Sequence, residues 1–180
     1  MLNKFPKLMI LGYARHGKDT VADILAKSFG LRAMSSSLWA AEKVMKPYFD
    51  SIGVYYANFD EMYADRVNHR QEWFEQIKTY NAVDGARLAR SLYENHDIYV
   101  GIRNPLELEA INAERLYDYS IWVDRSKHLE PEPTTSNQMR PDMANYVLDN
   151  NGTLQELEIN ARLLYLDLLS LEVYGSTKGQ

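Results

Sequence analysis

The chain has 180 residues, of which 46% are hydrophobic and 25% charged, and it has no cysteine; we expect one globular domain, and a disulfide scaffold or Cys-ligated zinc is excluded. The formal net charge of −5, with no dense basic run, argues against stable nucleic-acid binding but leaves room for a small phosphate ligand. No stretch approaches roughly 18 apolar residues, and the N-terminal run predicts a strand and not a signal peptide, so we expect no membrane span and a cytoplasmic protein.

The first predicted elements are a strand, a glycine-containing loop and a helix. Residues 7–11, "KLMIL", form an apolar run that is typical of a buried strand. After the loop, apolar residues recur at helical spacing until Gly30, which is a common helix stop. These apolar positions are Val21, Ile24, Leu25 and Phe29.

The next part of the chain is expected to be mostly helical. Residues 38–95 are rich in aromatics, with breaks expected at Pro47, Gly53 and Gly85. Beyond them we predict a strand at 98–102 and a helix from about 105 to 116.

The last third of the chain predicts two more strands, a loop and a helix. The strands are expected at 119–124 and 145–149, on either side of the polar loop 125–143. The final helix begins at Thr153, with Glu156 completing a capping box. Its predicted buried stripe consists of Leu154, Leu157, Ala161, Leu164 and Leu168. Strands separated by helices indicate an α/β fold with a parallel sheet.

The loop "GYARHGKDT" nearly matches the phosphate-binding pattern G-x-x-x-x-G-K-[ST]. Its glycines let several backbone N–H groups point at one phosphate, and the following helix adds its positive dipole end. The pattern departs at Asp19, which stands where a hydroxyl is expected, while Thr20 follows one place late. The alternative is an ordinary strand-to-helix turn. The predicted ATP-binding residues are Gly12, Arg15, His16, Gly17, Lys18, Asp19 and Thr20.

Three segments resemble the phage deoxynucleoside monophosphate kinases. In that family an Asp commonly follows the loop lysine, as in "GKDT" here, although animal phosphomevalonate kinases share a GKD loop. The segment "DIYVGIRNPLELEAI" is similar to the family's strand ending in x-Arg-x-x-x-Glu, and "DMANYVLDNNGTLQELEINARLL" to its last strand, turn and helix. Residues 38–83 match only loosely, and Gly101 stands where many relatives carry Asp.

The resemblance implies a P-loop NTPase-like parallel sheet flanked by helices, in a single kinase domain over residues 1–180. It implies a helical monophosphate-binding insert at about 38–95 and a short lid loop at about 125–143. The implied reaction is transfer of a phosphoryl group from ATP, with Mg²⁺, to a deoxynucleoside monophosphate, in the host cytoplasm if the protein is phage-encoded. Either Asp19 or Thr20 would hold the metal, and the sequence does not choose between them.

Arginines are the expected partners of the moving phosphoryl group, since they bind phosphate bidentately and stay charged. We predict that Arg103, at the carboxyl end of a strand, and Arg125, in the lid loop, act with Lys18 in catalysis. For Glu107 two roles stay open beside that of a helix N-terminal carboxylate: pairing with Arg103, or touching the nucleotide. The predicted acceptor-binding residues are Arg70, Arg87, Arg103 and Glu107.

Two other functions stay open at this point. The chain fits a P-loop kinase for another small acceptor, such as dephospho-coenzyme A or phosphomevalonate, and it fits a non-catalytic nucleotide-binding regulator. The expected partners are small-molecule nucleotides, with a homodimer as one option.

Overall fold

The computed structural model describes residues 5–134 and 137–175. Its centre is a five-stranded sheet in the order β2-β3-β1-β4-β5, in which every pairing is parallel. The strands are β1 (Leu8–Leu11), β2 (Ala33–Ser35), β3 (Ile98–Val100), β4 (Tyr119–Asp124) and β5 (Tyr146–Asp149). The predicted α/β class, a parallel sheet flanked by helices, is confirmed.

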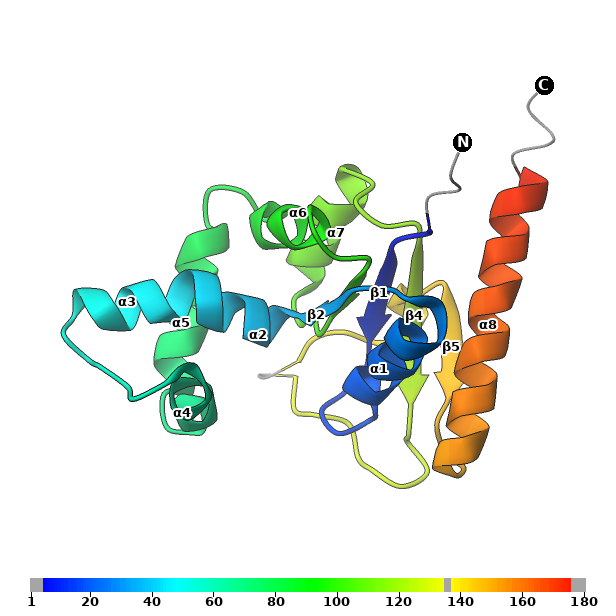
Figure 1. Cartoon of the computed structure of the whole chain (residues 1–180), viewed down its shortest axis with the longest axis horizontal. Helices are drawn as coiled ribbons and strands as arrows, with labels where there is room; N and C mark the ends of the chain where they lie inside the picture. Colours follow the sequence, from blue (N-terminus) through cyan, green and yellow to red (C-terminus); the bar gives the residue numbers. More distant parts are fainter. Residues whose placement is uncertain (1–4, 135–136, 176–180) are drawn as a thin grey trace.

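Helices cover both faces of the sheet (Figure 1). Leu8 and Ile10 of β1 pack on the face covered by α1 (Lys18–Phe29) and α8 (Leu154–Gly175). Met9 and Leu11 pack on the other face, against α6 (Arg87–Tyr93) and α7 (Pro105–Ala113). Because both faces are covered, β1 is apolar at every position and does not alternate.

The end of α1 and the start of α8 lie where the sequence analysis predicted them. Gly30 closes α1 in the left-handed conformation, and its N–H donates to Ala26 O. At the start of α8, Glu156 accepts a hydrogen bond from Thr153 N at 2.7 Å, and Glu156 N donates back to Thr153 Oγ1. The predicted buried stripe of α8 was wrong at Leu154, which is the first residue of the helix and is 65% exposed.

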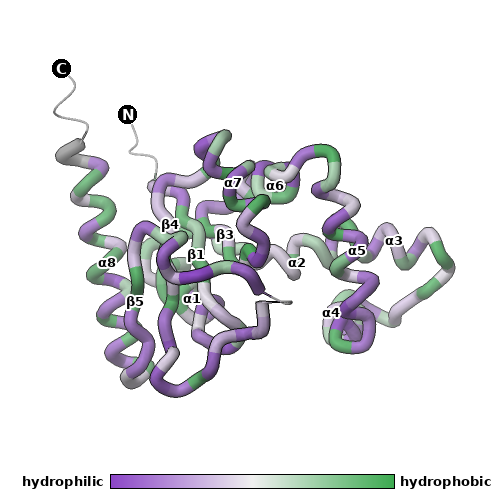
Figure 2. Tube along the Cα trace, turned by 180° about the vertical axis from the view of Figure 1, so that it is seen from behind, coloured by the Kyte–Doolittle hydropathy of each residue, from purple (hydrophilic) through white to green (hydrophobic). Residues whose placement is uncertain are grey.

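The helical insert leaves the sheet at its β2 edge and has a small core of its own (Figure 1). Figure 2 shows its helices grouped on the side away from α8. The insert comprises α2 (Ser36–Ala40), a π-helical segment (Ala41–Met45), α3 (Lys46–Ser51), α4 (Phe59–Ala64), a 3-10 turn (Asp65–Val67) and α5 (Arg70–Asn81). Its core is formed by Ala41, Met45, Phe49, Met62 and Trp73.

The predicted break at Pro47 was wrong, because the chain stays helical from Ser36 to Ser51. Pro47 lies in the first turn of α3, directly after the π-helical segment. There Lys46 N donates to Ala41 O, five residues back, and proline needs no donor of its own in a first turn. The breaks predicted at Gly53 and Gly85 are confirmed: Gly53, with φ +76°, follows the end of α3, and Gly85 lies between α5 and α6.

Strand β2 was missed by the sequence analysis, since three half-buried residues carry no periodic signal. The predicted lid loop is irregular except for a 3-10 turn at Pro141–Met143, and its positions 135–136 lie outside the described residues. Among the described residues, no helix combines the length and apolarity that crossing a membrane requires.

Candidate active site

The loop after β1 has the shape of a phosphate cradle. Gly12 has φ +145°, and a Cβ built there would lie 2.8 Å from the carbonyl oxygen of Val123. Gly17 has φ +97°, and a Cβ there would collide with the side-chain amide of Asn150. Arg15 has φ +63°, so the loop also holds a non-glycine residue in the left-handed region. Both motif glycines are therefore required by the backbone path and by close neighbours.

Lys18 is folded back over this loop. Its Nζ donates to the carbonyl oxygen of Tyr13 at 2.7 Å. Burial lowers the pKa of the ammonium, and the charge of Arg103 lowers it further, while Asp19 opposes the shift. Lys18 therefore sits beside the cradle as a partly desolvated cation, where attraction to an anion is stronger than in water.

A buried network ties the loop to the ends of β4 and β5. Asn150 Nδ2 donates to His16 O at 2.8 Å, and the ring Nδ1 of His16 accepts from Arg125 N at 3.1 Å. The guanidinium of Arg125 donates to Asn150 O at 2.7 Å. His16 is fully buried, and burial lowers its pKa. Arg125 thus lies near the loop, but its guanidinium is bonded to the Asn150 turn; its catalytic role stays a prediction.

Glu132, which the sequence analysis missed, links the loop to Arg103. Its carboxylate accepts from Ala14 N at 2.6 Å, from the Arg103 guanidinium at 3.1 Å and from Asn137 Nδ2 at 3.1 Å. The side chain is only 16% exposed. Burial opposes its ionisation, but the hydrogen bond from Asn137 and the charge of Arg103 outweigh burial and lower the pKa of Glu132. An anionic oxygen therefore lies between a loop N–H and the predicted catalytic arginine.

Glu107 and Gly101 lie near the carboxyl end of β3. The carboxyl group of Glu107 accepts a hydrogen bond from the Tyr99 hydroxyl at 3.0 Å, and burial raises its pKa to about 7. Gly101 has φ +97°, and its carbonyl accepts from Ser36 Oγ at 3.1 Å. The Glu107 carboxyl group thus pairs with the Tyr99 hydroxyl, while Arg103, its predicted partner, forms an ion pair with Glu132.

Two of the predicted acceptor arginines, Arg70 and Arg87, lie on separate helices, α5 in the insert and α6 on the sheet. Arg70 is exposed at the first residue of α5, and the Arg87 guanidinium stacks over the Tyr80 ring at 4.0 Å. A further arginine, Arg66, was missed: its guanidinium lies 4.3 Å from the centre of the Tyr63 ring and donates to the Tyr63 hydroxyl at 2.6 Å. No motif marks Arg66, which occupies a loosely matched segment.

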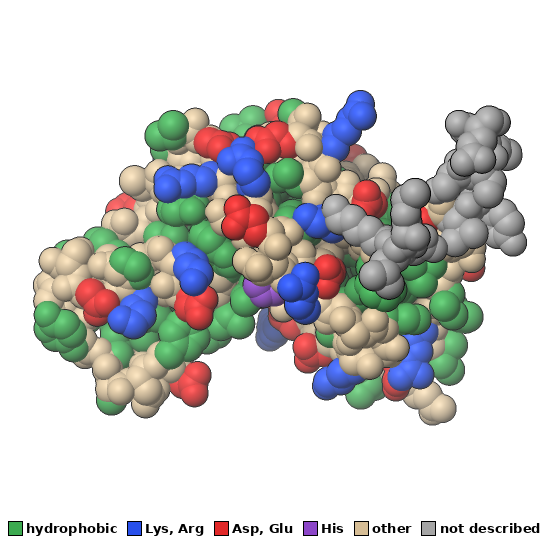
Figure 3. Space-filling model, turned by 45° about the horizontal axis from the view of Figure 1, so that its top comes forward, with side chains coloured by type: hydrophobic (Ala, Val, Ile, Leu, Met, Phe, Trp, Pro, Cys, Tyr) green, Lys and Arg blue, Asp and Glu red, His purple; other side chains and the backbone are tan. Residues whose placement is uncertain are grey.

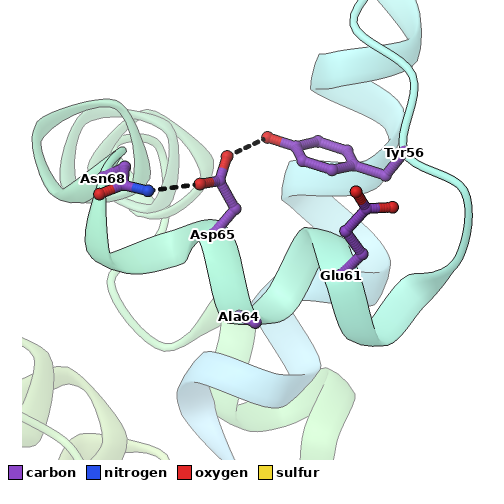
Figure 4. Close-up of a pocket in the computed structure, with 5 residues that line it drawn as sticks. All are labelled: Tyr56, Glu61, Ala64, Asp65 and Asn68. Atoms are coloured by element: carbon purple, nitrogen blue, oxygen red, sulfur yellow. Dashed lines mark hydrogen bonds between the residues drawn. The ribbon is translucent and has the colours of Figure 1, made fainter.

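The surface is indented between the insert and the rest of the molecule, as the space-filling view shows (Figure 3). Basic and acidic side chains are interspersed on this face. A shallow pocket also lies within the insert, lined by Tyr56, Glu61, Ala64, Asp65 and Asn68 (Figure 4). There the Asp65 carboxylate accepts from the Tyr56 hydroxyl and from Asn68 Nδ2, so its oxygens are already engaged.

Several solved structures are similar to this chain. TT1252 from Thermus thermophilus has 21% identity and a TM-score of 0.55, over 92% of this chain and 99% of that one. Shikimate kinase from Aquifex aeolicus has 14% identity and a TM-score of 0.48, over 97% and 99%. A gluconokinase from Sinorhizobium meliloti has 15% identity and a TM-score of 0.47, over 97% and 99%.

At 21% identity, the likeness to TT1252 shows the fold alone. No protein-family model and no curated protein matches the chain. The nucleoside monophosphate acceptor implied by the resemblance therefore stays a prediction.

The predicted metal residues lie beside the loop. Asp19 and Thr20 are both exposed in the first turn of α1, next to Lys18. Within residues 5–134 and 137–175, no group of three or more His, Asp or Glu side chains is placed to hold a metal ion. A Mg²⁺ ion at this place would thus need oxygens of the nucleotide and water beside one loop ligand, which is usual for Mg²⁺.

Proposed function

We propose that the chain is an ATP-dependent kinase that phosphorylates deoxynucleoside 5′-monophosphates. The observation that supports kinase activity is the position of the Glu132 carboxylate, which accepts hydrogen bonds from both Ala14 N and the Arg103 guanidinium. An anion held there, beside Lys18, marks a subsite that combines a loop N–H, a lysine and an arginine. Those are the groups that phosphoryl transfer requires.

The acceptor part of the proposal rests on the resemblance to the phage kinases and on the position of the insert. The insert follows β2, whose neighbour β3 leads to Arg103, so acceptor and donor phosphates would meet at the carboxyl ends of the strands. On the insert side, Arg66 adds a cation, which lies over the Tyr63 ring.

In the proposed reaction the loop N–H groups and Lys18 hold the donor phosphates, and Arg103 holds the phosphoryl group against the acceptor. Their positive charges stabilise the charge that spreads over the phosphoryl oxygens in the transition state. Asp19 and Thr20 are the residues that would hold Mg²⁺, which when bound neutralises phosphate charge. Since both phosphate acceptor and donor oxygens are already ionised, no general base is needed.

A panel assay tests the proposal. ADP release is measured with ATP and, in turn, each of the four deoxynucleoside monophosphates, dephospho-coenzyme A and phosphomevalonate. We expect turnover with at least one deoxynucleoside monophosphate. Turnover only with one of the last two acceptors would refute the acceptor class, and ATP binding without turnover for any acceptor would favour a regulator.

Two variants connect the assay to the site. Arg103→Ala is expected to lower kcat/KM, by about 1.5–3 kcal/mol in activation free energy, since it removes a charge-assisted contact made by a side chain that is 53% exposed. Arg90→Ala is the matched control, because Arg90 is paired with Asp84 and Glu114 on the surface. Equal effects of the two substitutions would remove Arg103 from the site.

A further inference from the structure

The phosphate subsite of this chain already contains an anion of its own. Glu132 lies in the loop after β4, 118 residues from Ala14 in sequence, yet its carboxylate accepts the Ala14 N–H at 2.6 Å. The other carboxylate oxygen accepts from Arg103 at 3.1 Å. One carboxylate therefore spans a loop donor and an arginine, as a phosphate group does in such sites.

A buried asparagine holds the Glu132 carboxylate in this position. Asn137 Nδ2 donates to Glu132 at 3.1 Å and to the carbonyl oxygen of Gly12 at 3.4 Å, and Asn137 is 3% exposed. Asn137 thereby holds the carboxylate against the first glycine of the loop. The pKa of Glu132 is lowered, since hydrogen bonding from Asn137 and the charges of Arg103 and Lys18 outweigh burial, so the carboxylate is ionised at neutral pH.

Without the Glu132 carboxylate, the positive charges of Lys18 and Arg103 would repel each other beside the loop. The charge of Arg103 lowers the pKa of Lys18, whereas that of Glu132 raises it. Glu132 therefore compensates the repulsion between these two cations. A phosphate that takes the Ala14 N–H must replace the carboxylate, because this single N–H is already held by Glu132 at 2.6 Å and a second anion at that distance would be strongly repelled.

We propose that Glu132 is an autoinhibitory anion that occupies the phosphate subsite and is displaced when a nucleoside triphosphate binds. The inference deepens the proposed function and rests on it. The nucleotide can bind only when the Glu132 contacts are broken. The apparent dissociation constant is therefore the intrinsic one divided by the fraction of molecules in which the subsite is open. Arg103 changes its partner from Glu132 to phosphate in the same step.

The test is calorimetric titration of ATP into the wild-type chain, Glu132→Gln, Glu132→Ala and the control Glu130→Gln. Glutamine keeps the shape and an acceptor for Ala14 N but removes the charge, and exposed Glu130 changes the net charge equally, two residues away. We expect the ATP dissociation constant to fall about tenfold in both Glu132 variants, which corresponds to about 1.4 kcal/mol, and to stay unchanged in the control.

Thermal unfolding with inorganic pyrophosphate gives a second measurement that needs no nucleotide. Both Glu132 variants should unfold at a lower temperature than the wild type without ligand, and pyrophosphate should raise their midpoints more than that of the wild type. ATP binding that is unchanged or weaker in the Glu132 variants would overturn the inference and leave the proposed function standing. Failure of the wild type and every variant to bind ATP would overturn both.

Discussion

Replacing Gly17 by alanine tests whether the buried Asn150 network holds the phosphate loop in place. Gly17 has φ +97°, and a left-handed conformation costs alanine about 1–2 kcal/mol relative to glycine. The new Cβ also collides with the side-chain amide of Asn150, which donates to His16 O and is 6% exposed. Breaking that buried hydrogen bond adds about 1–3 kcal/mol. The expected loss is therefore about 2–5 kcal/mol.

Gly30→Ala is the matched control at the other end of α1. Gly30 is also left-handed, with φ +71°, but a Cβ there meets no atom within 4 Å. Its expected cost is the conformational part alone, about 1–2 kcal/mol.

Urea denaturation of both variants, with unchanged m-values, gives the two free energies of unfolding. Thermal unfolding checks them, at roughly 2–4 °C per kcal/mol for a chain of this size. Gly17→Ala should also lose ATP binding, whereas Gly30→Ala should keep it. Equal destabilisation by the two substitutions would refute the argument that Asn150 packs against the loop and fixes its path.

Three further predictions concern the site. Lys18→Ala should abolish phosphoryl transfer and leave the unfolding midpoint within a few degrees of wild type, because the Lys18 ammonium donates to a loop carbonyl and Lys18 belongs to none of the hydrophobic clusters. Near-wild-type turnover would disprove the loop assignment. Asp19→Asn should raise the Mg²⁺ concentration needed for half-maximal activity, measured by Mg²⁺ titration, and an unchanged midpoint would remove Asp19 from the metal site. Burial raises the pKa of Glu107 from 4.5 to about 7, so Glu107 binds its proton more tightly in the folded protein, and the free energy of unfolding should fall as the pH rises from about 4.5 to 7. In urea titrations at several pH values, Glu107→Gln should show a smaller fall over that window. An identical profile would contradict the burial argument.

The sequence by itself determined the features that depend on short-range physics. The strand, loop and helix of residues 7–30 were predicted, because strand hydrophobicity, glycine backbone freedom and helical spacing are all local properties. The capping box was predicted for the same reason, since Thr153 and Glu156 are three residues apart. Gly12 and Gly17 were assigned from spacing alone, although the neighbours that exclude a side chain there are distant in sequence.

Only the tertiary structure decided which distant groups meet at the loop. Glu132 and Ala14 are 118 residues apart, and Asn150 and His16 are 134 apart. These contacts depend on β1, β3, β4 and β5 aligning their carboxyl ends, so a residue's partner follows from strand order and register. A carboxylate in a polar, proline-containing loop has no pattern that distinguishes it from a solvated charge. The pairing of Glu132 with Arg103 therefore follows only from the tertiary structure, in which the sheet brings the loop after β4 against the loop after β1.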